Sequence, residues 1–120
     1  SYVVYPSEIF MNVLEDALQR GVKVDILLDA NVDDARDKLE KLIKKHKHLS
    51  FYRRKDNEER MHAKTIVTDK TACVITSANL TEHAMKKNME AGVYIKGGEI
   101  PRKLHDHFAS LIYTNILEVY

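Results

Sequence analysis

The chain has 120 residues, the size of one ordinary domain, so we expect residues 1–120 to form a single domain or a piece of a longer protein. Hydrophobic residues make up 44% and charged residues 31%, a balance that excludes the disordered and low-complexity classes. No apolar run approaches the ~18 residues that cross a bilayer, no leader-like segment opens the chain, and Cys73 is the single cysteine. We therefore expect a folded cytoplasmic protein with no membrane span.

Charge is unevenly distributed, although the net charge is only +1. Residues 1–37 carry three Lys/Arg and eight Asp/Glu, whereas residues 38–64 carry ten Lys/Arg and four Asp/Glu. The basic residues that we expect to contact a polyanionic substrate are Lys41, Lys44, Lys45, Arg53 and Arg54. A charge-rich helix is more often only a solvated face, and both interpretations stay open at this point.

Helix and strand patterns alternate in the first half of the chain. Residues 2–5 favour a strand, and Ser7 is a suitable N-cap for a helix that ends at Gly21. Residues 22–28 predict an inner strand. A second, basic helix follows a cap at residue 33 or 34, and residues 49–54 predict a short strand.

The second half predicts mainly strands and a closing helix. Residues 61–68 and 72–77 favour two strands, and their three-residue connection is short enough for an antiparallel hairpin. Helical turns at 81–87 and a last strand at 89–96 precede a helix that begins near Pro101. These patterns predict an α/β fold, a mixed β-sheet with helices packed on its faces.

Polar residues suited to phosphate chemistry cluster in and after the predicted hairpin. His62 and Lys64 would share one face of the 61–68 strand, because side chains alternate along a strand. Asp69 follows that strand, and Ser77 and Asn79 share a parity at the end of the next one. A histidine can attack phosphorus or carry a proton, while a lysine and an amide can neutralise phosphate oxygens. This set fits the cleavage of a phosphodiester.

The spacing of these residues resembles the phospholipase D superfamily, whose signature is His-x-Lys-(x)4-Asp followed by Gly-Ser-x-Asn. Residues 61–69 (MHAKTIVTD) match the first part, and residues 76–79 (TSAN) match the second, except that Thr76 stands where glycine is commonest. Asn88 and Glu90 match an Asn-x-Glu that family members carry on the next strand. The combination is far more specific than His-x-Lys alone.

The resemblance implies a role for each matching residue. His62 would be the nucleophile that forms a phosphohistidine, and Lys64 and Asn79 would hold the phosphate oxygens, a network that Ser77 would support. Glu90 would accept a hydrogen bond from the far nitrogen of His62. Asp69 would have a structural role and anchor the hairpin. The resemblance implies neither a metal nor another cofactor.

The resemblance also bears on assembly and substrate. The family mechanism uses two histidines, and this chain carries one motif, which implies a homodimer with the site on its two-fold axis unless the chain is a fragment. Single-motif members are mostly nucleases, so we expect a metal-independent nuclease whose partner is nucleic acid, with DNA favoured over RNA, and no membrane partner. The alternatives are a phosphodiesterase that cleaves phospholipids and a non-catalytic sensor or scaffold of the same fold.

Overall fold

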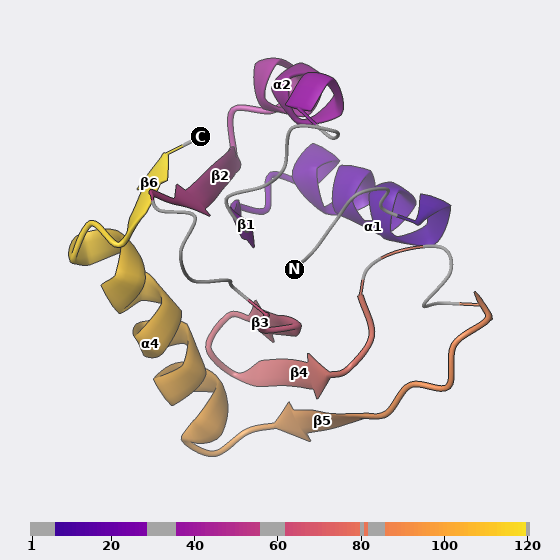
Figure 1. Cartoon of the computed structure of the whole chain (residues 1–120), viewed down its shortest axis with the longest axis vertical. Coiled ribbons are helices and arrows are strands. Elements are labelled where there is room, and N and C mark those ends of the chain that lie inside the picture. The colour runs from indigo at the N-terminus through magenta and orange to yellow at the C-terminus, as the bar shows by residue number, and fades with distance from the viewer. Residues whose placement is uncertain (1–6, 29–35, 56–61, 80, 82–85, 120) are drawn as a thin grey trace.

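The computed structural model describes residues 7–28, 36–55, 62–79, 81 and 86–119, with only the backbone of residues 36–39 (Figure 1). The helices and strands are α1 (Glu8–Gln19), β1 (Val24–Leu28), α2 (Arg36–Lys45), β2 (Leu49–Arg54), β3 (Thr65–Thr68), β4 (Ala72–Thr76), β5 (Gly92–Lys96), α4 (Ile100–Tyr113) and β6 (Leu117–Val119). The expected mixed α/β class is confirmed, and the strands form two three-stranded sheets. The predicted strand at 2–5, the cap at 33 or 34 and most of the turns at 81–87 lie outside the described residues.

The first sheet has the order β1-β2-β6, with β1 parallel and β6 antiparallel to the central β2. The helix α1 supplies Leu14 and Leu18 to the core below this sheet, where they cluster with three buried strand residues. Those strand residues are Leu28, Leu49 and Phe51. Removing such side chains from water is the main stabilising contribution to this half of the chain.

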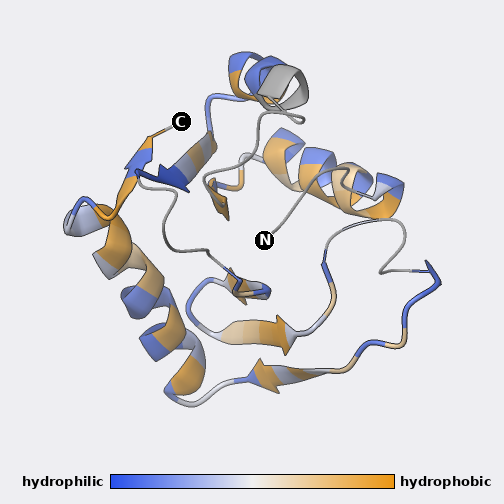
Figure 2. Cartoon of the chain, viewed as in Figure 1, coloured by the Kyte–Doolittle hydropathy of each residue, from blue (hydrophilic) through white to orange (hydrophobic). Residues whose placement is uncertain are grey.

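The ends of α1 follow the sequence prediction. Ser7 is fully buried, and its side chain accepts a hydrogen bond of 3.2 Å from the backbone N–H of Phe10, which is the expected N-cap. Gly21 has a φ of 82°, a conformation that glycine adopts without steric cost and that ends the helix. Apolar and polar residues form stripes along α1 and along α4 in Figure 2.

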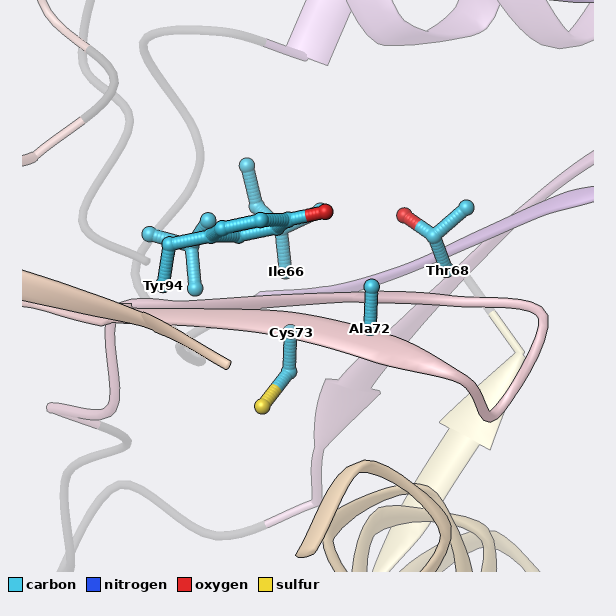
Figure 3. A pocket seen from close by; sticks show the side chains of 6 residues that line it. Ile66, Thr68, Ala72, Cys73 and Tyr94 are labelled. Atoms are coloured by element: carbon cyan, nitrogen blue, oxygen red, sulfur yellow. The ribbon is translucent and has the colours of Figure 1, made fainter. Parts of the chain in front are cut away.

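The second sheet is antiparallel throughout, in the order β3-β4-β5. The predicted hairpin is present: Asp69 and Lys70 form its turn with φ values of 51° and 59°, and such a turn matches the twist of the flanking strands. Cys73 is 2% exposed. Its side chain points to the face that α4 contacts, opposite to the face that carries Ile66 and Tyr94 (Figure 3).

Three details of the second half differ from the sequence prediction. The first strand of the hairpin begins at Thr65 rather than at residue 61, and β5 begins at Gly92 rather than at 89. Residues 62–64 and 89–91 instead have irregular backbone beside the strand ends. The short strand β6 follows Asn115, at a φ of 57°, and was not predicted.

No helix within the described residues is long and apolar enough to span a membrane.

Candidate active site

His62 and Lys64 contact each other directly before β3 begins. The ammonium nitrogen of Lys64 lies 3.0 Å from Nδ1 of His62 and 3.0 Å from the His62 carbonyl oxygen. His62 is exposed and Lys64 is half-buried. The sequence placed both residues on one face of a strand, and this was wrong, because β3 starts only at Thr65. A local contact on irregular backbone brings the two side chains together.

The chemistry of this contact fixes which atom donates. An ammonium has three N–H donors and no lone pair, so Lys64 donates and Nδ1 of His62 accepts. A neutral imidazole in this arrangement carries its proton on Nε2. The contact therefore predicts the Nε2–H tautomer for a neutral His62 in the chain without a ligand.

Ser77 and Asn79 follow the end of β4, as expected. The backbone N–H of Ser77 donates to the carbonyl oxygen of Ala91 at 3.0 Å, and the N–H of Ala91 donates back to Oγ of Ser77 at 3.2 Å. Asn79 is half-buried, and its Oδ1 is buried without a hydrogen-bond partner among the described residues. Buried amide oxygens usually have a partner, so this amide has unused bonding capacity next to the site.

Glu90 lies two residues before β5 and is held by two side chains. The hydroxyl of Ser77 donates to its Oε2, and Nδ2 of Asn88 donates to its Oε1 at 3.2 Å. The pKa of Glu90 is lowered by the hydrogen bond from Ser77, then by that from Asn88, and to a smaller extent by the positive charge of Lys64. Glu90 is therefore an ionised acceptor, electrostatically linked to the His62–Lys64 pair.

The expected role of Glu90 toward His62 remains a prediction. In the described part of the single chain, the contacts of the carboxylate go to Ser77 and Asn88, and Nδ1 of His62 faces Lys64. The contribution of Asn88 was not assigned from the sequence beyond its place in the Asn-x-Glu motif. The two-residue spacing is the signal that could have indicated it.

The remaining candidates lie apart from this group. Asp69 is exposed in the β3–β4 turn, at the end of β3 opposite to Lys64, which suits the structural part expected for it. The helix α2 packs against the first sheet, and Figure 1 places it on the opposite side of the view from β4. The helix α2, which carries Lys41, Lys44 and Lys45, is therefore distant from β4.

Within the basic segment, Lys41 and Lys44 are exposed. Lys45 pairs with Glu15 at 2.8 Å and lowers the pKa of that carboxyl through a hydrogen bond and its charge. Arg53 pairs with Glu118 on β6 at 3.1 Å, and Arg54 is half-buried on the same strand, β2. Charge pairing inside the chain thus already engages Lys45 and Arg53.

The hollow in Figure 3 lies on the open face of the second sheet, between Ile66 of β3 and Tyr94 of β5. It does not include His62 or Lys64. No group of three or more His, Cys, Asp or Glu residues that could hold a metal ion occurs in the described ranges. Metal independence remains a prediction for experiment.

The residues of the motif thus form a His62–Lys64 contact and a Ser77–Glu90 contact. Comparison with known proteins decides the family. The family described as "Cardiolipin synthase, PLD-like domain" matches residues 1–112. The chain belongs to the phospholipase D superfamily. Its fold agrees with the crystal structure of the phospholipase D family member Nuc from Salmonella typhimurium, with a TM-score of 0.77 and 24% identity over 97% of this chain and 76% of that one.

Two relatives within the superfamily illustrate its breadth. The DISARM protein DrmC of Bacillus paralicheniformis is 32% identical over 118 residues, which is 95% of this chain and 48% of DrmC. A cardiolipin synthase of Clostridium perfringens is 28% identical over 109 residues, which is 86% of this chain and 22% of that protein. The chain thus spans about half the length of the first relative and about a fifth of the second.

Proposed function

We propose that this chain is a metal-independent phosphodiesterase of the phospholipase D type, with nucleic acid as its substrate. The observation that carries the proposal is the direct contact of Lys64 with His62 beside the Ser77–Glu90 network. It combines a potential nucleophile, a cation for phosphate oxygens and an ionised acceptor within one exposed region. Membership of the phospholipase D superfamily supports the same chemistry.

The reaction would proceed in two displacements. A ring nitrogen of His62 attacks phosphorus, the N–P bond forms, and the P–O bond to the leaving group breaks as that oxygen takes a proton from a second histidine. Water then attacks the phosphohistidine, gives a proton to that histidine and releases His62. Lys64 and Asn79 would bind the non-bridging oxygens as negative charge develops on them.

The second histidine would come from a second copy of this chain. Because a single motif supplies one histidine, we propose a homodimer with two copies of His62 at its two-fold axis. The exposure of His62 supports this arrangement, since the imidazole is accessible to a partner. A chain that is part of a longer protein would instead take its second histidine from that protein.

Charge favours nucleic acid as the substrate. Lys41 and Lys44 expose their side chains on α2, where they can contact phosphates some distance along a polyanion from the reacting group. We propose DNA ahead of RNA. The second candidate substrate is a phosphatidyl ester, which the match to a cardiolipin synthase favours.

Incubation with labelled single- and double-stranded DNA, RNA and phosphatidylglycerol vesicles, in excess chelator, tests the proposal. We expect cleavage of a nucleic acid, substrate phosphate bound to His62 after an acid quench, and loss of both in His62→Ala. The matched control is His107→Ala, which changes an exposed histidine on α4. Cleavage only of the lipid would support the second candidate, and strict dependence on added Mg²⁺ or Zn²⁺ would contradict metal independence. No turnover of any substrate by a dimeric chain would favour a sensor or scaffold.

A further inference from the structure

Thr76 connects the three segments that carry the candidate site. Its backbone N–H donates to the carbonyl oxygen of Lys64 at 3.1 Å, directly beyond the β3–β4 ladder. Its Oγ1 donates to the carbonyl oxygen of Ala91 at 3.2 Å and accepts from the N–H of Ala78 at 3.1 Å. One residue therefore contacts the segment of His62, the turn before Asn79 and the segment of Glu90.

The Ala91 contact is shared with Ser77. The carbonyl oxygen of Ala91 accepts from both Oγ1 of Thr76 and the N–H of Ser77, using both of its lone pairs. The N–H of Ala91 donates to Oγ of Ser77, which in turn donates to Glu90. Loss of the Thr76 hydroxyl would leave the N–H of Ala78 without this acceptor. It would also remove one of the hydrogen bonds that join the end of β4 to Ala91.

The space around Thr76 fixes its side chain. Thr76 faces Gly92 across the β4–β5 pair, and a Cβ placed on Gly92 would lie 2.8 Å from Cβ of Thr76 and 2.9 Å from its Oγ1. Such distances are too short for real atoms, so the absence of a side chain at 92 makes room for the threonine. The φ of Thr76 lies outside the left-handed region that would demand glycine.

We propose that Thr76 is a positioning residue whose hydroxyl holds Ser77 and Asn79 in register with Glu90. The expected effect on kcat rests on the proposed function. The expected effect on the positions of Ser77, Asn79 and Glu90 does not depend on any activity. Groups that act on a phosphodiester must be held within about 0.5 Å of their productive geometry, and small displacements lower turnover strongly.

Three variants of the full chain separate the hydroxyl from the shape of the side chain. Thr76→Val keeps the shape and removes the hydroxyl, and Thr76→Ser keeps the hydroxyl. The matched control, Thr68→Val, makes the same change at an exposed position on β3. Circular dichroism shows whether Thr76→Val folds. If it does not fold, Thr76→Ala, which removes the hydroxyl without adding bulk, takes the place of Thr76→Val in both measurements.

The kinetic measurement uses whichever phosphodiester the wild type cleaves. We expect Thr76→Val to lower kcat about tenfold or more with KM changed less than about threefold, because groups that act in the transition state are displaced while most substrate contacts persist. Thr76→Ser should keep kcat within about twofold of the wild type. A kcat in Thr76→Val equal to that of Thr68→Val would overturn the inference.

The structural measurement is the carboxyl ¹³C titration of Glu90 by NMR, which needs no turnover. Loosening of Ser77 should raise the pKa of Glu90 in Thr76→Val toward its ordinary value and leave it unchanged in Thr76→Ser and Thr68→Val. An unchanged titration in Thr76→Val would overturn the inference. If the wild type cleaves no phosphodiester, the proposed function fails, and this titration alone decides the role of Thr76.

Discussion

The ammonium of Lys64 donates to both Nδ1 and the carbonyl oxygen of His62, each at 3.0 Å. Two of the three N–H groups of the ammonium are thus engaged with His62, and the third can still donate to a phosphate oxygen. Lys64 can therefore contact the imidazole and neutralise charge on the reacting group at the same time. The contact also fixes the resting tautomer of His62, which can be measured.

We expect the neutral imidazole of His62 to carry its proton on Nε2 in the chain without a ligand. Long-range ¹H–¹⁵N correlation spectra at about pH 8.5, where an ordinary histidine is neutral, distinguish the two ring nitrogens. Lys64→Met should remove this tautomer preference, while His107 should give the same spectrum in both proteins. Predominant protonation of Nδ1 in the wild type would contradict the assigned contact.

Lys64→Met should also lower kcat of the cleaved phosphodiester by about 100- to 1000-fold, the usual effect of removing one donor to a developing oxyanion. The matched control is Lys70→Met, which removes an exposed lysine from the β3–β4 turn. Steady-state kinetics on both variants checks this expectation. Comparable losses in both would mean that the rate responds to overall charge rather than to the contact with His62.

Ser77→Ala should raise the pKa of Glu90, because the hydroxyl of Ser77 is the main cause of its lowered value. A carboxyl with a lowered pKa in the folded chain adds stability above the pKa of the unfolded chain, and this contribution is lost as pH falls through the folded value. The wild type should therefore lose more stability than Ser77→Ala below about pH 4.

Urea unfolding at pH 7 and near pH 3, together with the carboxyl titration, measures this difference for Ser77→Ala. Ser110→Ala, which changes an exposed serine on α4, is the control. Equal acid sensitivity of Ser77→Ala and the wild type would show that the Ser77–Glu90 contact does not govern the titration.

Local sequence signals predicted most of the elements. The Ser7 cap, Gly21, the short hairpin connection and Pro101 each act on their own neighbourhood, and each corresponds to an observed boundary or turn. The three residues of β6 are too few for a periodic pattern, which explains why that strand was not predicted.

The site was predictable as a set of residues but not as a set of contacts. The motif spacing identified His62, Lys64 and Glu90, yet it placed the first two on a strand that begins later in the chain. Contacts such as Thr76 with Ala91 join residues that are 15 positions apart and depend on the register of β4 and β5. Alternation within one strand carries no information about that register.

Gly92→Ala should destabilise the second sheet by roughly 1–3 kcal/mol, the usual cost of overpacking. The new Cβ would lie 2.9 Å from the carbonyl oxygen of Ile75 as well as against Thr76, and a backbone atom cannot rotate away. Chemical denaturation measures the change. Gly98→Asn is the control, because no heavy atom lies within 4 Å of a Cβ there and asparagine tolerates a φ of 69°. A stability equal to that of the wild type would contradict the packing of Thr76 over Gly92.

Charge reversal at Lys41 or Lys44 should weaken binding of a polyanion without changing the catalytic rate at saturation. Each lost phosphate contact should reduce the slope of log affinity against log salt by about 0.7 to 0.9. Reversal at Lys96, an exposed lysine of β5, is the control. Titration of labelled DNA at several salt concentrations checks the expectation. Unchanged affinity and slope would leave α2 as a solvated face.

Subunit mixing tests the proposed assembly, because one histidine attacks while the second protonates the leaving oxygen. An equal mixture of wild type and His62→Ala with random exchange contains about a quarter wild-type dimers. Activity should therefore fall to about a quarter of the wild-type value, whereas chains that act alone would retain about half. The same mixture with His107→Ala should keep full activity, and native mass spectrometry verifies the exchange.

A monomeric active chain would contradict the shared site. A monomeric inactive chain would instead indicate that the second histidine belongs to a longer protein, since a phosphohistidine cannot form efficiently when no group protonates the leaving oxygen.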